Sequence, residues 1–129
     1  LIKRNKAENS IYLVGSSSNV KEWYKQASIF VLSSEFEGYP NVLIEAMACG
    51  LPCVSFDCPH GPADIITHGE DGLLVPNGNL EQLAEALIDV MEHEQKRQSM
   101  GAAAKENVKR YLPKQIMPLW DTLFNDLKK

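Results

Sequence analysis

Two glutamates eight residues apart, Glu37 and Glu45, are the residues of this sequence best suited to binding chemistry. They lie in the segment SSEFEGYPNVLIEAMACG, residues 33–50, where a glycine-containing loop leads into an apolar helical pattern. An ionised carboxylate accepts hydrogen bonds from two neighbouring hydroxyls, so it suits a sugar diol. Glu45 follows Asn41 by one helical turn and shares a face with it. We therefore expect one diol-binding acid before the helix and a second acid on it.

The start of this helix is a predicted anion site. Pro40 fits the first helical position, where a missing N–H costs nothing, and Gly38 allows the sharp turn before it. The amides of Asn41, Val42 and Leu43 then lie unpaired at the positive end of the helix dipole, which favours phosphate or diphosphate. An acid beside a sugar, amides on a diphosphate and an acid on a ribose together predict a nucleotide-sugar site.

A simpler interpretation of the two acids is that Glu37 caps the helix and Glu45 lies on a solvated face, since acids are common in first turns. The apolar residues of the helix weigh against it, because they leave little solvated face: Val42, Leu43, Ala46, Met47 and Ala48. A lone acid in such a helix needs a partner.

Short apolar strands alternate with helices along the first part of the chain. Strands are expected at about 11–14, 29–32, 52–56 and 72–75, and helices follow at about 79–93, 95–110 and 114–127. This alternation predicts an α/β fold with a Rossmann-like parallel sheet and flanking helices. Such sheets bind ligands at the carboxyl ends of their strands, so the loops GSSSN, SSEFEGY and DCPHGP are expected to line one edge together. Pro118 is expected to kink the last helix or to delay its start.

The composition excludes some classes of protein. The 129 residues carry a net charge of −4, which gives no reason to expect a nucleic-acid partner. No apolar run approaches the roughly 20 residues that span a bilayer. The first residue is Leu1, so we expect that the natural protein starts elsewhere. The apolar stripe of the last helix, around Trp120 and Phe124, lacks a basic opposite face, so we expect it to pack on protein rather than on a membrane.

Three cysteines, Cys49, Cys53 and Cys58, are an odd number and favour a reducing compartment over a disulfide framework. With His60 nearby they invite a zinc interpretation, but neither gap is the CxxC typical of structural zinc. Small buried hydrophobic residues are the alternative that we favour. His60 itself either contacts a ligand in the cleft or is simply solvated.

The combined pattern resembles the signature of the group 1 family of retaining glycosyltransferases with the GT-B fold. The resemblance is carried by EGYPNVLIEAMACGLPCVSFD, with its two glutamates, its AMA triplet, its turn and its following strand, and by GEDGLLVPNGN further on. It covers the chain up to about Leu87 and becomes diffuse in the helices beyond.

The resemblance implies a role for each matching residue. Glu37 corresponds to the acid that contacts the donor sugar and stabilises charge near its anomeric carbon, and Glu45 to the acid that binds the ribose. The donor-binding set that it implies comprises Gly38, Tyr39, Pro40, Asn41, Val42, Leu43, Glu45, Gly15, Ser16 and Asn19. Members of the family generally need no divalent metal, and no DxD metal motif is present.

Substrates and location also follow from the resemblance. DCPHGP is similar to a subset of the family that builds bacterial polysaccharides or lipid-linked oligosaccharides, which implies a UDP-linked hexose or N-acetylhexosamine donor. Relatives of the same fold include epimerases and synthases that use ADP-glucose. The implied location is cytoplasmic, and peripheral association with the inner face of the membrane is a further implication for the intact enzyme.

The chain departs from the family pattern at its start. Two β–α units with a diphosphate-binding arginine and lysine, and the acceptor domain, have no counterpart, so we expect part of a donor-binding domain that is inactive alone. The exposed sheet edge would then be covered by strand 11–14, by a second copy of the chain or by absent sequence. A non-catalytic module that binds a nucleotide or sugar phosphate is the alternative function.

Overall fold

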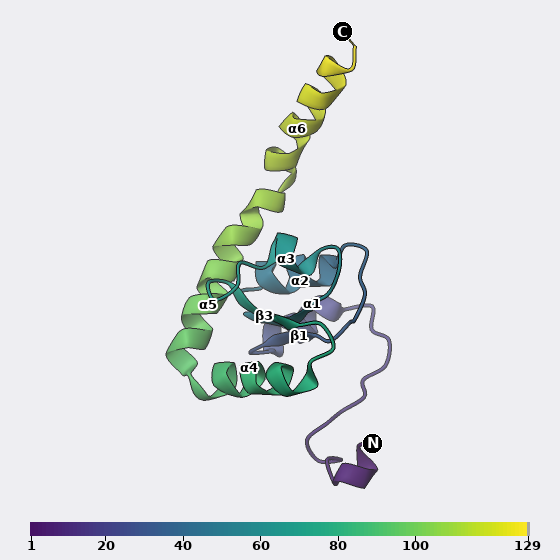
Figure 1. The fold of residues 1–129 in the computed structure, drawn as a ribbon, viewed down its shortest axis with the longest axis vertical. Helices are drawn as coiled ribbons and strands as arrows, with labels where there is room; N and C mark the ends of the chain where they lie inside the picture. Colours follow the sequence, from purple (N-terminus) through teal and green to yellow (C-terminus); the bar gives the residue numbers. More distant parts are fainter. Residues whose placement is uncertain (129) are drawn as a thin grey trace.

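The computed structural model describes residues 1–128 and places a three-stranded parallel sheet at the centre of the chain (Figure 1). The strands are β1 (Phe30–Leu32), β2 (Cys53–Asp57) and β3 (Gly72–Pro76), in the order β1-β2-β3. Leu32 pairs with Ser55, and Asp57 pairs with Pro76. Strand β2 is central and buried up to Asp57. The predicted α/β class is confirmed, and these strands lie close to three of the expected ranges.

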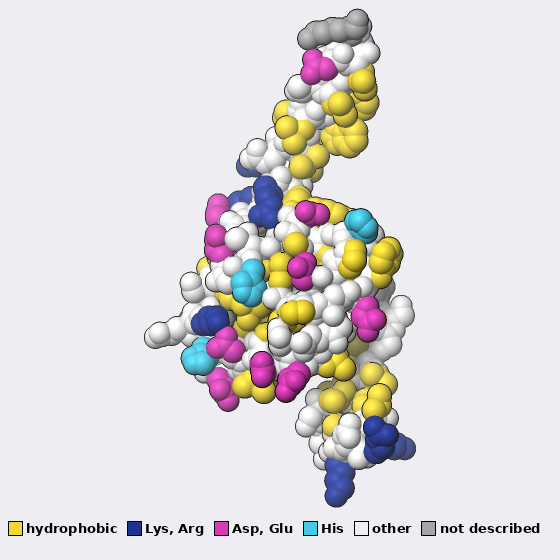
Figure 2. All heavy atoms as spheres, viewed as in Figure 1, with side chains coloured by type: hydrophobic (Ala, Val, Ile, Leu, Met, Phe, Trp, Pro, Cys, Tyr) yellow, Lys and Arg dark blue, Asp and Glu magenta, His cyan; other side chains and the backbone are white. Residues whose placement is uncertain are grey.

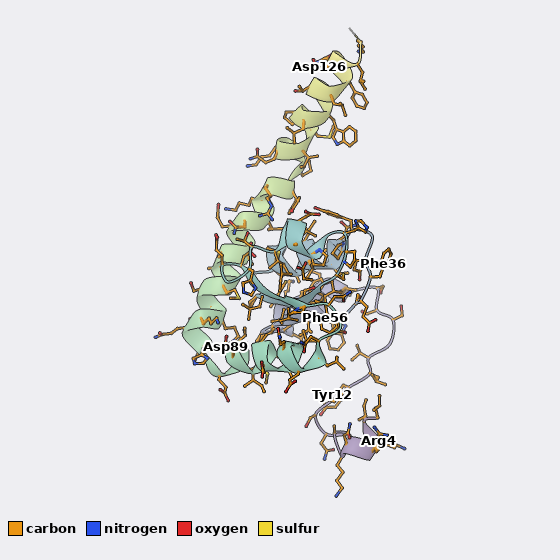
Figure 3. All side chains as sticks on the ribbon, viewed as in Figure 1. Arg4, Tyr12, Phe36, Phe56, Asp89 and Asp126 are labelled. Carbon is orange, nitrogen blue, oxygen red and sulfur yellow. The ribbon has the colours of Figure 1, made fainter. Side chains whose placement is uncertain are left out.

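Helices cover both faces of this sheet. On one face lie α2 (Asn41–Ala48) and α3 (Pro62–Ile65), on the other lies α4 (Leu80–Glu92), and α5 (Glu94–Asn107) runs along the side of both layers. Side chains alternate along β2, so Cys53 enters the core with α2 and α3, whereas Val54 and Phe56 enter the core with α4. Phe56 lies between the sheet and α4 in Figure 3.

The remaining elements are shorter or lie outside this body. Helix α1 (Val20–Gln26) precedes β1, and the 3-10 helices η1 (Lys3–Asn5) and η2 (Val108–Tyr111) lie near the start of the chain and after α5. Helix α6 (Pro113–Asp126) projects from the body, at the opposite end from η1 (Figure 1). Pro118 lies inside α6. The expectation that Pro118 delays the start of this helix is therefore wrong.

The strand expected at 11–14 is wrong for this structure. These residues have no regular secondary structure, and their side chains are exposed, up to 86% for Leu13. A strand needs a neighbour for its N–H and C=O groups, and residues 11–14 pair with none of the strands formed within residues 1–128. Strand 11–14 therefore does not cover β1, which was one of three expectations for that edge.

Candidate functional site

The loops that follow the three strands meet at one edge of the sheet. Asn77, after β3, donates its side-chain amide to the carbonyl oxygen of Glu35, after β1, at 2.9 Å. The ring of Phe36 meets the ring of His60, after β2, edge-on with centroids 6.4 Å apart. Phe36 lies at the outer rim of the body (Figure 3). The expectation that SSEFEGY and DCPHGP lie side by side is thus confirmed by contacts between them.

Glu37 lies half-buried in the first of these loops, opposite Cys58 in the second. Only 3% of Cys58 is exposed. This burial, and next the negative charge of Glu37, raise the pKa of the Cys58 thiol, so the thiol stays protonated beside the carboxylate. Within residues 1–128, no lysine, arginine or histidine forms an ion pair with Glu37. Its carboxylate therefore remains able to accept from hydroxyl groups.

Helix α2 begins differently from the sequence expectation. Pro40 is the N-cap residue, with φ −79° and ψ 81°, and the first helical residue is Asn41. No side chain caps this helix, so the interpretation of Glu37 as its cap is wrong.

Two of the three amides predicted to be free are engaged within the chain. Asn41 N–H donates to Tyr39 O and Leu43 N–H to Pro40 O, both at 2.9 Å. The amide of Val42 has no acceptor among the described residues. The turn before α2 is tight enough to bring carbonyl groups back onto the helix start, which the sequence pattern did not indicate. An anion at this end meets one unengaged amide rather than three.

Glu45 is exposed on α2 and accepts a hydrogen bond from a buried residue of α1. The hydroxyl of Tyr24, on α1, donates to Glu45 Oε2 at 3.2 Å. Only 8% of Tyr24 is exposed. Burial, followed by the hydrogen bond and the charge of Glu45, raises the pKa of Tyr24 to about 12. No pattern in the sequence connects Tyr24 of α1 with Glu45 of α2, which is 21 positions away.

A groove of about 310 Å³ lies between α1 and α2 and contains this pair. Its lining residues are Val20, Lys21, Tyr24, Glu45, Ala48 and Cys49. Glu45 is therefore reachable from solvent on the α1 side, where the loop of Gly15, Ser16 and Asn19 leads into Val20. These three loop residues are exposed, and Asn19 N–H donates to Ser17 Oγ at 3.1 Å. None of the three is among the described residues that line the groove.

In the turn between Glu37 and α2, both the backbone at Gly38 and the side chain of Tyr39 are accessible. A Cβ added to Gly38 would meet no atom within 4 Å, so the backbone there is accessible. The side chain of Tyr39 is also accessible, with 47% of it exposed. His60 is exposed and has a positive φ of 65°.

Other kinds of site are not formed by the described residues. In residues 1–128, no three histidine, cysteine or acidic side chains come together as a metal-binding group. Cys53 and Cys58 are buried and Cys49 is half-buried, as expected for small hydrophobic residues. No helix in the described part of the chain combines the length and apolar character needed to cross a bilayer.

Comparison with known proteins identifies the family. The family described as "Glycosyl transferases group 1" matches residues 1–107. An exopolysaccharide phosphotransferase of Streptomyces coelicolor is 42% identical over 120 residues, which are 92% of this chain and 13% of that protein. The amylovoran biosynthesis glycosyltransferase AmsD of Erwinia amylovora is 35% identical over 124 residues, which are 96% of this chain and 35% of AmsD.

A solved structure agrees with this result. A mutant of Staphylococcus aureus TarM, crystallised with fondaparinux, α-GlcNAc-glycerol and UDP, matches with a TM-score of 0.89 at 28% identity, over 96% of this chain and 25% of that chain. The chain belongs to the group 1 glycosyltransferase family, and its sheet and flanking helices match the C-terminal domain of the GT-B fold. The resemblance drawn from the sequence is confirmed. The chain spans only 13% and 35% of the two curated relatives.

Proposed function

We propose that this domain binds the nucleotide-sugar donor of a retaining glycosyltransferase. The observation that carries the proposal is the arrangement around the start of α2: Glu37 before it, the unengaged amide of Val42 at it, and Glu45 one turn along. All three residues lie inside the segment that matches the family. The arrangement offers, in chain order, an acceptor for sugar hydroxyls, a donor for a phosphate oxygen and an acceptor for a second diol.

The donor that we infer is a UDP-linked hexose or N-acetylhexosamine. The TarM structure at 28% identity contains UDP and α-GlcNAc-glycerol, which carries an N-acetylhexosamine. In our proposal the ribose of UDP binds Glu45 in the groove between α1 and α2. Tyr24 supports this role because its hydroxyl holds one carboxylate oxygen, Oε2, and leaves the other for the ribose.

Glu37 is the proposed catalytic residue. During transfer, the bond between the anomeric carbon and the diphosphate oxygen breaks and its electron pair leaves with UDP. The oxygen of an acceptor hydroxyl forms the new bond on the same face, and the proton of that hydroxyl passes to the leaving diphosphate oxygen. Positive charge develops on the anomeric carbon, and a carboxylate beside it stabilises that charge. The backbone at Gly38 and the amide of Val42 would lie against the sugar and the leaving diphosphate. No step in this proposal requires a divalent metal.

The acceptor in our proposal is a glycan or a lipid-linked oligosaccharide, held by a part of the protein outside this chain. The name of AmsD, amylovoran biosynthesis glycosyltransferase, supports a polysaccharide product. A cytoplasmic location, with peripheral association of the intact enzyme at the membrane, belongs to the same proposal. The phosphotransferase relative transfers a different group, but this chain matches only 13% of it, so its name need not describe the matched part.

Calorimetric titration of the intact enzyme with UDP, UDP-glucose and UDP-N-acetylglucosamine tests the donor proposal. We expect Glu45→Ala to weaken binding of UDP and of both UDP-sugars by about 1–3 kcal/mol, the usual effect of unpairing polar groups. Glu85→Ala is the matched control, because Glu85 is an exposed glutamate within α4. Unchanged affinity in Glu45→Ala would remove Glu45 from the site.

A UDP-release assay on the same protein, with acceptor added, distinguishes an enzyme from a non-catalytic binding module. An enzyme that binds a UDP-sugar and releases UDP when acceptor is added supports transfer. Tight binding of UDP-sugar with no UDP release in the presence of any glycan acceptor would favour a non-catalytic module that holds a nucleotide or sugar phosphate.

A further inference from the structure

The loops that follow β1 and β2 are in contact at two places near the proposed catalytic residue. At the first, the ring of Phe36 meets the ring of His60 edge-on. At the second, Gly61 packs so closely on Pro40, the N-cap of α2, that a Cβ added to Gly61 would overlap Pro40 Cδ. Glu37 lies between these two contacts in the chain, so the two rings are held at the outer side of its carboxylate.

The pair formed by Phe36 and His60 is open to solvent although both loops are anchored. Phe36 is 72% exposed, at the outer rim of the body (Figure 3). His60 is exposed as well, and its φ of 65° is a left-handed conformation that non-glycine residues seldom adopt. Residues in this conformation carry strain and cluster at active sites and ligand-binding sites. The protein therefore holds two rings at its surface, where burial within the chain contributes little to stability.

A pyranose ring is the ligand whose chemistry fits this surface. The face of an aromatic ring carries partial negative charge and attracts the C–H groups on the apolar face of a sugar. The hydroxyl groups around the edge of the same sugar need acceptors, and the carboxylates of Glu35 and Glu37 flank Phe36 in the chain. Glu35 is exposed, and Glu37 is half-buried. An aromatic face bordered by acids is suited to one sugar unit.

The position of Phe36 favours the acceptor sugar over the donor sugar. In the proposed function, the donor extends from Glu37 along the start of α2 to Glu45. Phe36 precedes Glu37, and its ring is turned to the loop after β2. A group that approaches the anomeric carbon from this side is the acceptor. We propose that Phe36, supported by His60, binds the pyranose ring of the acceptor. This inference rests on the proposed function, and it gives the chain one contact to an acceptor that is otherwise held outside it.

Transfer kinetics of the intact enzyme test this inference, with the methyl glycosides of glucose, galactose and N-acetylglucosamine as acceptors. We expect Phe36→Leu, which keeps an apolar side chain but removes the aromatic face, to raise the KM for the best methyl glycoside roughly three- to tenfold. Phe36→Trp, which keeps such a face, should stay within about twofold of wild type. The Kd for the tighter of UDP-glucose and UDP-N-acetylglucosamine, measured by calorimetry, should change less than about twofold in both variants.

Met91→Ala is the matched control, because it also removes an exposed apolar side chain. Met91 is 64% exposed near the end of α4. The nearby Asp89 lies on the far side of the body from Phe36 (Figure 3). This variant should leave both the KM and the Kd unchanged.

A second variant, His60→Gly, removes the support of the Phe36 ring. Glycine adopts a φ of 65° without strain, so this variant should keep or raise the free energy of unfolding while it raises the same KM roughly two- to threefold. A double variant of His60→Gly and Phe36→Leu should lose little more than Phe36→Leu alone, because His60 acts through Phe36.

The outcomes separate this inference from the proposed function. An unchanged KM in Phe36→Leu, or a Kd for the UDP-sugar that weakens as much as the KM rises, would overturn the inference. So would an intact enzyme that binds a UDP-sugar but transfers to none of the three methyl glycosides. A wild-type enzyme that binds neither UDP nor a UDP-sugar would instead overturn the proposed function itself.

Discussion

The contact between Tyr24 and Glu45 explains how an apolar helix carries an acid. Glu45 is exposed on α2, whereas Tyr24 is buried on α1, so the bond joins a solvated carboxylate to a hydroxyl that has little access to water. A buried hydroxyl without a partner would cost about 1–3 kcal/mol, which Glu45 prevents. The same bond fixes the direction of the carboxylate in the groove. At the scale of single residues, stability and the proposed ribose site thus depend on one pair.

This pair predicts a loss of stability in alkaline solution. The pKa of Tyr24 is raised from 10.0 to about 12 in the folded protein, so the folded state holds its proton more tightly than the unfolded state. The resulting stabilisation is complete below pH 10 and is lost as the pH rises from 10 to about 12. We expect the free energy of unfolding, measured with urea up to about pH 12, to fall across this window.

The Tyr24→Phe variant should lower the free energy of unfolding near neutral pH only modestly and should make its fall above pH 10 shallower. Tyr39 and Cys53, whose pKa values are also raised to about 12, and Cys58, whose pKa burial raises, contribute the rest of the slope. The Tyr12→Phe protein serves as a control and should keep the wild-type slope. A slope that is identical in Tyr24→Phe and wild type would contradict the role of this hydroxyl.

The site residues could be predicted from the sequence only as far as local spacing extends. The eight-residue separation of Glu37 and Glu45 and the turn at Gly38 are local features, and the structure has them where the pattern indicates. The return of the Asn41 amide to Tyr39 O depends on the dihedral angles of a tight turn, which residue types do not determine. Tyr24 and Glu45 are 21 positions apart in the chain, and a single sequence does not show which distant residues come into contact.

At the scale of elements, the contact between α2 and α5 depends on two glycines. Gly50 closes α2 with a φ of 79°, as its position after the helix predicts. Its carbonyl oxygen lies directly against Gly101 of α5, where an added Cβ would overlap it. A glycine within a helix weakens it, but at position 101 the missing side chain lets two helices approach closely.

This contact predicts whether replacing Gly101 by alanine raises or lowers the free energy of unfolding. Alanine favours helix over glycine by about 1 kcal/mol. At Gly101 we nevertheless expect alanine to lower the free energy of unfolding by about 1–3 kcal/mol, because overpacking against backbone requires α5 to move away. Chemical denaturation measures the change. The exposed Ser99 on the same helix provides the control, since Ser99→Ala should be neutral or slightly stabilising. A stabilised Gly101→Ala protein would show that the two helices separate easily.

The elements themselves could be predicted where their partners are near in sequence. The strands β1, β2 and β3 are apolar runs joined by short helical connections, and each has a neighbour within the chain. Residues 11–14 have the same composition, yet they form no strand because strand formation depends on a neighbour as well as on residue type. The residue types of a segment indicate its tendency to form a strand, but they do not indicate whether another strand is available to pair with it.

At the scale of the whole molecule, large apolar side chains are exposed at both ends. Figure 2 shows hydrophobic side chains gathered along α6, and further ones on the N-terminal segment. On α6 the exposed residues are Met117, Leu119, Trp120, Leu123 and Phe124. Trp120 and Phe124 stack with ring centroids 5.7 Å apart, which places them on one side of the helix. The proposed donor site lies in the body between these two ends.

The composition of the site predicts that the 129-residue chain alone gives no turnover. Expulsion of a diphosphate requires positive charge at the leaving group, and such electrostatic contributions are usually the largest in catalysis. Within residues 1–128, the start of α2 supplies one unengaged amide, and the cation that lines the groove beside Glu45 is Lys21. Nor does any described residue form a second wall that could hold an acceptor and exclude water. We expect UDP to raise the unfolding temperature of the chain, while UDP release from a UDP-sugar stays at background; the intact enzyme, assayed in parallel, should release UDP. Sustained turnover by the purified 129-residue protein would show that the residues around Glu37 and Glu45 suffice for transfer.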